Sequence, residues 1–329
     1  MEQALRQAVF VLVVAGLAAP AVAHASEKEP AYPAKPIRFV VPYHPGGTPD
    51  IQGRRFAEKL RQRLGQPVIV DNRPGANASI GMGIVARAPA DGYTIVIAPV
   101  GPWTVNPHLY KLPYDVFTDL APIIHATATP GALAVHPSVP VHSVKELIAL
   151  AHDKPGVLNY GSTGVGGFGH MSAELFSSMT HTRMMHIPQK SISAALTDLI
   201  GGHIHVLFNV ASPTIPMIKS GKVRGLATTG TKRLEALPDL PTVAEAGVPG
   251  YENATWNGIG APARTPRAII ELLNHEFVAI LHLPDVMEAA RIEGSTIVAS
   301  TPEQFRDYLK AEYLKYGKLV KEAGIKVED

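Results

Sequence analysis

The fold is decided by residues 36–70, PIRFVVPYHPGGTPDIQGRRFAEKLRQRLGQPVIV. The opening run 36–42 is short and almost continuously apolar, which is typical of a buried parallel strand. After the Pro-Gly-Gly turn, apolar side chains recur every four residues at Phe56, Leu60 and Leu64, so this spacing predicts an amphipathic helix. The apolar PVIV that ends the stretch predicts a second strand. Strand, turn, helix and strand in this order indicate a parallel α/β sheet.

The rest of the chain repeats the alternation of strands and helices. A capping box at Ser143-Val144-Lys145-Glu146 opens one predicted helix, and Thr301 caps the last, which runs towards Ala323. Further predicted elements are strands at Thr94–Ala98, His205–Phe208 and Val223–Ala227, and helices over Met171–Met179, Ile192–Leu199 and Ile269–Leu281. The whole pattern predicts an α/β protein.

Two segments look like places where the chain passes between two lobes. One is the apolar strand with a Pro/Gly turn at 127–137, and the other is the Pro/Gly-rich run 237–262. Two crossings imply that the first lobe is discontinuous. We therefore expect lobe 1 to comprise 26–126 plus 252–329, and lobe 2 to comprise 127–251.

The first 25 residues have the pattern of an export signal. Arg6 gives a thin positive region, and Ala8–Leu17 is an apolar run too short to span a bilayer. Small residues follow and offer cleavage after Ala23 or after Ala25. We expect a cleaved signal peptide at 1–25 and a periplasmic protein. An uncleaved anchor is the alternative.

Composition excludes several classes of function. The chain has 30 Lys and Arg against 28 Asp and Glu, a formal charge of +2, with no basic cluster that would suit nucleic acid. It has no cysteine, so a thiol nucleophile, a thiolate metal site and a disulfide are ruled out. His203-Ile204-His205 would place two imidazoles on one strand face, but without a third ligand at suitable spacing we interpret it as a surface feature. We expect neither a metal nor a cofactor.

Two glycine-rich loops, each joining a strand to a helix, are the candidate binding elements. Such loops line the ligand crevice of open α/β sheets, and their N–H groups and helix N-termini favour anions. The alternative for the first loop is an ordinary tight turn with Asp50 as the helix-cap residue. The candidate ligand residues are Gly46, Gly47, Thr48 and Asp50 in the first loop, Ser162, Thr163, Gly164, Gly166 and His170 in the second, and Asn209 opposite.

The two loops do not match the motifs of common enzymes. No Lys-Ser/Thr pair follows the glycines as in a Walker loop, the spacing is poor for a dinucleotide fingerprint, and no G-x-S-x-G elbow is present. We therefore expect a binding protein rather than an enzyme. The alternative is a hydrolase that uses Asp50 and His170 as an acid/base pair, but no activated nucleophile supports it.

A series of short motifs runs in order from about Tyr32 to Lys326. They are YPAKPIR (32–38), PGGTPD (45–50), GQPV (65–68), DNRPGA (71–76), ADGYT (90–94), NPHLYKLPYD (106–115), HPSVP (136–140) and LPDLPTVAEAG (237–247). Together they resemble the tripartite tricarboxylate transporter substrate-binding (Bug) family. The resemblance implies a type II periplasmic-binding fold, in which two lobes, each a mainly parallel sheet flanked by helices, close on a ligand cleft.

The resemblance also implies a function: capture of a small carboxylate and its delivery to the membrane permease of a tripartite tricarboxylate-type transporter. We expect a monomer; a co-receptor that presents the same ligand to a membrane sensor is an alternative. Four departures from the family pattern bear on specificity: Pro49 replaces Thr, Asn209 replaces Asp, and the amides Gln189 and Asn257 replace aromatic rings. The loss of Asp at 209 argues against a ligand with an ammonium group.

Overall fold

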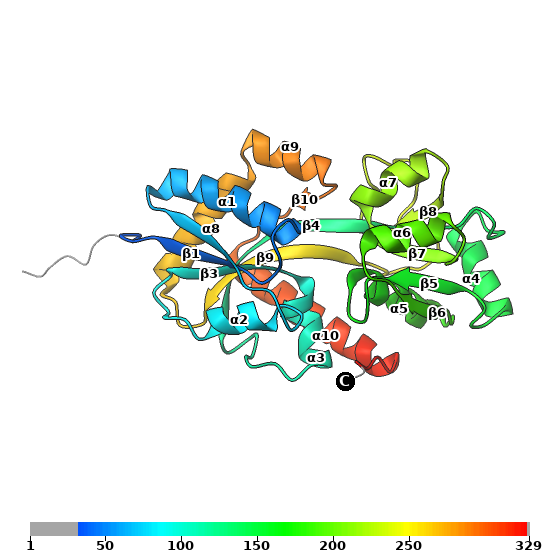
Figure 1. Ribbon diagram of the computed structural model, residues 1–329, viewed down its shortest axis with the longest axis horizontal. Helices are drawn as coiled ribbons and strands as arrows, with labels where there is room; N and C mark the ends of the chain where they lie inside the picture. Colours follow the sequence, from blue (N-terminus) through cyan, green and yellow to red (C-terminus); the bar gives the residue numbers. More distant parts are fainter. Residues whose placement is uncertain (1–31, 328–329) are drawn as a thin grey trace, which may run out of the picture. The chain divides into compact units, whose positions relative to one another are not determined.

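The computed structural model describes residues 32–327, and residues from Pro33 onward form one unit (Figure 1). The predicted signal peptide and its cleavage after Ala23 or Ala25 lie outside the described residues. Within residues 32–327, no helix combines the length and the apolar character that crossing a membrane requires.

The first group of strands continues the pattern of residues 36–70. Strand β1 pairs in parallel with β2 and with β3, whereas β3 pairs with β9 and β9 with β4 in antiparallel fashion. A short strand, β10, pairs with the same part of β4. The bounds are β1 Ile37–Val41, β2 Val68–Asn72, β3 Thr94–Pro99, β4 Leu120–Val135, β9 Ala254–Pro262 and β10 Thr296–Ile297.

The second group of strands is assembled on the far end of β4. That end pairs in antiparallel fashion with β7 and β8, while β5 pairs in parallel with both β7 and β6. The bounds are β5 Asn159–Ser162, β6 Met185–Pro188, β7 Val206–Val210 and β8 Arg224–Thr228.

Helices flank both groups of strands (Figure 1). Their bounds are α1 Thr48–Leu64, α2 Ser79–Ala86, the π-helical turn η1 Gly101–Val105, α3 Asn106–Leu109, α4 Val144–Asp153, α5 Phe168–Thr180, α6 Ile192–Ile200, α7 Ala211–Lys219, α8 Arg267–Leu281, α9 Pro284–Ile292 and α10 Pro302–Glu322. Both predicted caps form helix starts: the Ser143 hydroxyl accepts from the Glu146 N–H, and the Thr301 hydroxyl accepts from the Gln304 N–H. Only at Thr301 is the capping box complete; at α4 the Glu146 carboxylate accepts from the His142 N–H instead of the Ser143 N–H.

Strand β4 changes partners along its length. Its residues up to Pro130 pair with β9, and from Gly131 onward they pair with β7. Figure 1 shows β4 and β9 running between the two groups of strands. The α/β class predicted from the sequence is confirmed. The sheets are mixed, because every pair that includes β4 or β9 is antiparallel, whereas β1 with β2 and β3, and β5 with β6 and β7, pair in parallel.

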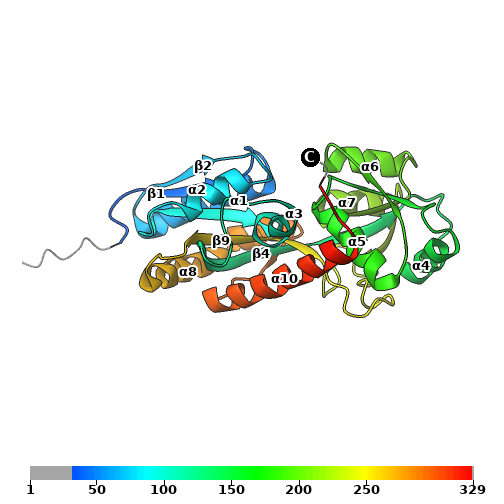
Figure 2. The same ribbon diagram turned by 90° about the horizontal axis from the view of Figure 1, so that it is seen from below.

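Helix α10 links the two groups from outside. It packs against β4, α3 and η1 in the first group and against α5 in the second (Figure 2). Its buried residues Phe305 and Tyr316 share one core cluster with Trp103 and with Met171 of α5. The Tyr316 hydroxyl donates to the Asn253 side chain (2.7 Å), whose amide in turn donates to the Ser172 hydroxyl of α5 (2.6 Å). The C-terminal segment therefore contributes to the packing of both groups.

Phe305 tests how much the first core contributes to stability. Its ring is fully buried and lies 5.7 Å from Trp103 and 5.6 Å from Trp256, measured between ring centroids. We expect Phe305→Ala to lower the free energy of unfolding by about 3–5 kcal/mol, because it leaves a cavity. Leu314→Ala on the same helix, at a side chain 70% exposed, should change it by less than about 0.5 kcal/mol. Urea unfolding measures both, and similar losses in the two variants would contradict this packing.

Candidate functional site

The first loop is held together by the Asp50 carboxylate. Asp50 is buried, and its carboxylate accepts from the Gly46 N–H (2.9 Å), the Asn72 amide (2.8 Å) and the Arg54 guanidinium (3.1 Å). Gly46 adopts φ 88°, a left-handed conformation that glycine tolerates best. Burial raises the pKa of Asp50, but these hydrogen bonds outweigh it and leave the pKa below the usual range. Asp50 is therefore an anion that fixes its own loop.

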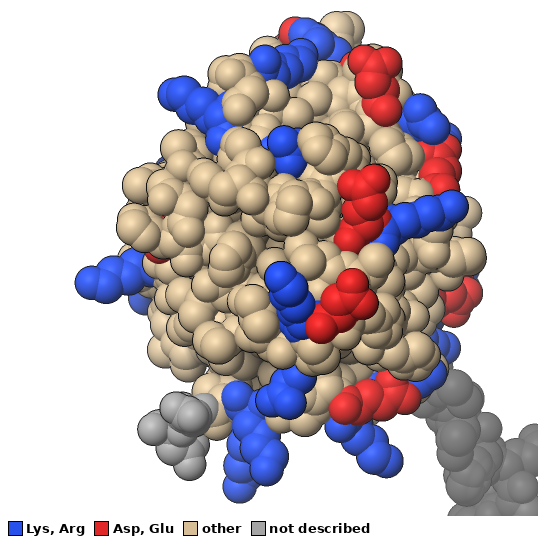
Figure 3. All heavy atoms as spheres, turned by 90° about the vertical axis from the view of Figure 1, so that its right-hand side faces the viewer, with Lys and Arg blue, Asp and Glu red and all other residues tan. Residues whose placement is uncertain are grey.

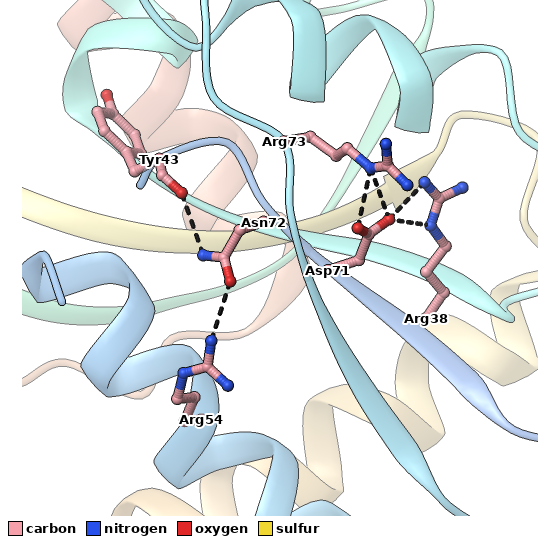
Figure 4. Close-up of polar contacts among 6 residues, drawn as sticks. All are labelled: Arg38, Tyr43, Arg54, Asp71, Asn72 and Arg73. Carbon is pink, nitrogen blue, oxygen red and sulfur yellow. Dashed lines mark hydrogen bonds and ion pairs between the residues drawn. The ribbon is translucent and has the colours of Figure 1, made fainter. Parts of the chain in front are cut away.

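The cations beside this loop are already paired. Figure 4 shows the Asp71 carboxylate between Arg38 and Arg73, which donate to it at 2.7 and 2.8 Å. The Asn72 amide donates to the Tyr43 carbonyl (3.1 Å), and its oxygen accepts from Arg54 (2.9 Å). Sequence reasoning missed Asn72 as an organiser of the loop. These guanidiniums are therefore engaged within the protein, and the other candidate donors at this end of the first group of strands are backbone N–H groups.

The N-terminus of α1 supplies such a donor. Gly47 is the N-cap residue and has no side-chain cap, and its carbonyl accepts from the N–H groups of Asp50 and Ile51 (both 3.0 Å). Pro49 has no N–H. The first N–H groups of a helix have no partner within the helix, so the N–H of Thr48 points out of the end of α1.

The second loop closes on itself through Ser162. The buried Ser162 hydroxyl oxygen accepts from the Gly164 N–H (3.1 Å) and lies 3.2 Å from the Gly164 carbonyl and 2.7 Å from Nε2 of His186. Gly164 and Gly166 have φ of 111° and 78°, which explains glycine at both positions. The Gly166 N–H donates to Nδ1 of His170 at 3.4 Å.

A small cavity lies between this loop, the start of α5 and the end of β7. Its volume is about 30 Å³, which is room for one small polar group. Of the predicted residues, it brings together Ser162, Thr163 and Asn209. Sequence reasoning missed the other lining residues, which are Phe168, Gly169, Ile192, Ala195, Leu207, Phe208 and Val210. Phe168 and Gly169 open α5, so free N–H groups of that helix lie at the cavity wall.

Asn209 forms the wall of the cavity opposite the loop. Its side chain is buried, and its amide donates to the Thr214 hydroxyl of α7 (3.1 Å), which donates to the Val210 carbonyl (2.9 Å). This chain of hydrogen bonds orients the amide. An uncharged side chain at this position leaves the cavity neutral.

His170 is not one of the residues that line the cavity. Its ring contacts His186. The two imidazole centroids are 4.4 Å apart, and His186 stacks on Tyr160 at 5.0 Å. Burial, and secondly the neighbouring His186, lower the pKa of His170 to about 4; burial also lowers the pKa of His186. Sequence reasoning missed His186 as a residue of this cluster.

The predicted site residues form two groups. The first group lies at the first loop and comprises Gly46, Gly47, Thr48 and Asp50. The second group lies at the second loop, the start of α5 and the end of β7, and it comprises Ser162, Thr163, Gly164, Gly166, His170 and Asn209. Within residues 32–327, no hydrogen bond or ion pair joins the two groups. The second loop nevertheless approaches the first group of strands, because a Cβ on Gly166 would lie 2.8 Å from Cδ1 of Leu109 on α3.

No metal-binding arrangement occurs in the part of the chain that the structure describes, where no three His, Cys, Asp or Glu side chains could hold an ion. His205 of the H-x-H pair accepts from the Asn159 N–H through Nδ1 (3.2 Å). On the face that carries α4, basic and acidic side chains are interspersed with uncharged surface (Figure 3).

Comparisons with known proteins agree with this architecture. Residues 53–325 match the family model described as tripartite tricarboxylate transporter family receptor. The protein BugT of Bordetella pertussis is 34% identical over 319 residues, which cover 96% of each chain. Among solved structures, R. palustris Rpa4515 with adipate is 37% identical with a TM-score of 0.76, covering 90% of this chain and 99% of that one. MatC from Rhodopseudomonas palustris with bound malate is 25% identical with a TM-score of 0.73, covering 88% and 100%. The predicted two-lobe fold is confirmed.

Asp50 gives the first loop a stability that depends on pH. Because its folded pKa is lowered, its contribution is present above the unfolded value near 3.9 and is lost as the pH falls through the folded pKa. Asp50→Asn should cost about 1–3 kcal/mol at pH 7 and less at pH 3, which lies below the unfolded pKa, as measured by urea unfolding. Asp307→Asn, at a side chain 80% exposed, is the control and should change little at either pH. An equal cost of Asp50→Asn at both pH values would show that its charge is irrelevant.

Proposed function

Because this chain belongs to the tripartite tricarboxylate transporter receptor family, we propose that it captures a small carboxylate between its lobes. It then delivers the carboxylate to the membrane permease of a tripartite tricarboxylate-type transporter. The observation that carries the proposal is the cavity at the N-terminus of α5, which combines helix N–H groups with the hydroxyls of Ser162 and Thr163. A carboxylate bound there replaces its hydrogen bonds to water with hydrogen bonds to donors that the protein holds in place.

The volume of the cavity limits which part of a ligand it can hold. About 30 Å³ holds one carboxylate group and not a whole dicarboxylate. The rest of the ligand extends from lobe 2 towards lobe 1, where the first loop presents the Thr48 N–H. Adipate and malate, which are bound to the two solved relatives, each carry two carboxylates. A dicarboxylate therefore suits a site that has one helix N-terminus in each lobe.

The lobe boundaries are part of the proposal. Lobe 1 comprises 26–126 plus 252–329, and lobe 2 comprises 127–251. The change of partners in β4 at Gly131 and the start of β9 at Ala254 support these limits. Ligand affinity for the closed arrangement of the lobes shifts the population towards it.

We also propose that the protein binds its ligand without converting it. The family and its solved members are solute-binding proteins. In this chain Asp50 is engaged by Gly46, Arg54 and Asn72, and no hydrogen bond in residues 32–327 joins it to His170. An acid/base pair made of Asp50 and His170 is therefore not assembled. The protein acts as a monomer in the periplasm after cleavage behind Ala23 or Ala25.

A thermal-unfolding screen tests the ligand class. The mature protein should gain stability with adipate or malate in proportion to the logarithm of ligand concentration, by about 2.7 kcal/mol at one hundred times Kd. Neutral analogues such as adipamide are the control and should have no effect, because the site offers donors to an anion. If only neutral solutes stabilised the protein, the proposal that the ligand is a carboxylate would be contradicted.

Ser162 tests the position of the carboxylate. Ser162→Ala removes a hydroxyl donor at the cavity, so we expect the Kd for the stabilising dicarboxylate to rise roughly tenfold to hundredfold, the range for a hydrogen bond to a charged group. Ser220→Ala, at an exposed serine outside the cavity, is the matched control. Isothermal titration calorimetry gives both values. Equal Kd values in the two variants would place the ligand elsewhere.

Asn209 tests the neutrality of the cavity. Asn209→Asp puts a second negative group on the wall of a buried site, so adipate affinity should fall at least tenfold. The same change should favour L-aspartate, whose ammonium pairs with the new carboxylate. The variant is titrated with both ligands at a pH at which its unfolding midpoint equals that of the wild-type protein. The two Kd values measure the change in ligand preference. Unchanged adipate affinity would show that Asn209 does not face the ligand.

A further inference from the structure

Behind the second loop lies a buried cluster of ionisable side chains that the proposed binding function does not use. Nε2 of His186 lies 2.7 Å from the Ser162 hydroxyl, and the His170 ring lies 4.4 Å from the His186 ring. The other titratable groups around His186 come from β5 and α5: Tyr160 stacks on it, and Glu174 accepts from the Tyr160 hydroxyl at 2.5 Å. His186 itself lies on β6, 24 residues from Ser162.

The Ser162 hydroxyl has one proton and two competing acceptors. The hydroxyl lies near the Gly164 carbonyl, at 3.2 Å, and near Nε2 of His186. If Nε2 is unprotonated, it accepts a hydrogen bond from the hydroxyl, whose proton then points away from the loop. If Nε2 carries a proton, it donates to the serine oxygen instead, and the hydroxyl proton is free for a ligand oxygen. The state of His186 therefore decides whether Ser162 is a donor to the ligand.

Only one of the two histidines suits a second proton. Nδ1 of His170 accepts from the Gly166 N–H, so protonating that nitrogen would place two donors against each other and break the loop contact. Nε2 of His186 faces a hydroxyl, which can accept. Two imidazolium ions with ring centroids 4.4 Å apart would repel strongly in a buried place. The pair can therefore take up at most one added proton, and His186 is the histidine that accepts it.

We propose, building on the proposed carboxylate function, that His186 is a positioning residue that takes up a proton when the anionic ligand binds at Ser162. The proton turns the Ser162 hydroxyl towards the ligand, and the charge that it brings offsets that of the carboxylate. Binding and protonation of His186 then favour each other, as thermodynamic linkage requires.

The direction of the effect follows from the surroundings. In the free protein, burial lowers the pKa of His186, and burial followed by the charge of His186 lowers that of His170, so both are neutral near pH 7. Burial raises the pKa of Glu174 more than the Tyr160 hydrogen bond lowers it. A bound carboxylate raises the pKa of His186. Affinity should therefore increase as the pH falls through the pKa of His186 in the complex.

Proton counting on the unmodified mature protein tests the proposal. Adipate and malate are titrated by calorimetry between pH 6.5 and 8, above the carboxyl pKa values near 4.3, in buffers of different ionisation enthalpy. We expect uptake of a fraction of a proton, at most about one, when the ligand binds. The Kd should fall by up to tenfold for each unit by which the pH is lowered. Binding without proton uptake overturns this inference and leaves the carboxylate function intact. Absence of binding by both ligands at every pH overturns both.

Variants assign the proton to His186. His186→Gln keeps an N–H that donates to Ser162 but cannot titrate, so it should bind the same ligand with no proton uptake and a pH-independent Kd. His186→Ala should likewise bind without proton uptake, because it removes the titrating imidazole. His275→Gln, at a side chain 77% exposed, is the matched control and should keep the wild-type pH profile. Proton uptake that persists in His186→Gln would refute the assignment.

Discussion

The close approach of β4 to the start of α5 is the constraint on which the second-lobe site depends. A Cβ on Gly131 would lie 2.4 Å from the Asn209 carbonyl oxygen and 2.7 Å from the Phe168 ring, so only glycine fits. At the same residue β4 leaves β9 and joins β7. The strand that links the two groups thus brings Asn209 and the first residue of α5 to the two sides of one cavity.

The two glycine-rich loops have different physical roles. In the first, a buried carboxylate uses the Gly46 N–H and two side chains, so the loop is rigid and few of its donors remain for a ligand. In the second, the main-chain donors at Gly164 and Gly166 are also engaged, but the N-terminus of α5 opens beside them. The proposed carboxylate site therefore rests more on helix N-termini and the serine hydroxyl than on the glycines, which let the chain turn.

Much of the fold could be predicted from local patterns. The strand, turn and helix over residues 36–70 and both helix starts at Ser143 and Thr301 occur as expected. The resemblance to the tripartite tricarboxylate transporter substrate-binding family is confirmed by the family match. The antiparallel placement of β4 and β9 was not predicted, because strand direction within a sheet depends on pairing between distant segments and leaves no periodic signal in either strand.

The sequence by itself determined the α/β class and the two glycine-rich loops that join a strand to a helix, since each rests on side-chain periodicity or on residues adjacent in the chain. Only the tertiary structure decided which side chains meet. Parallel pairing of β5 with β6 sets Tyr160 opposite His186 and so brings that imidazole to Ser162. The end of β2 likewise brings Asn72 to Asp50 at the start of α1, 22 residues away in the chain. Such contacts follow from strand register, which is selected by burial of the whole sheet and cannot be derived from one segment.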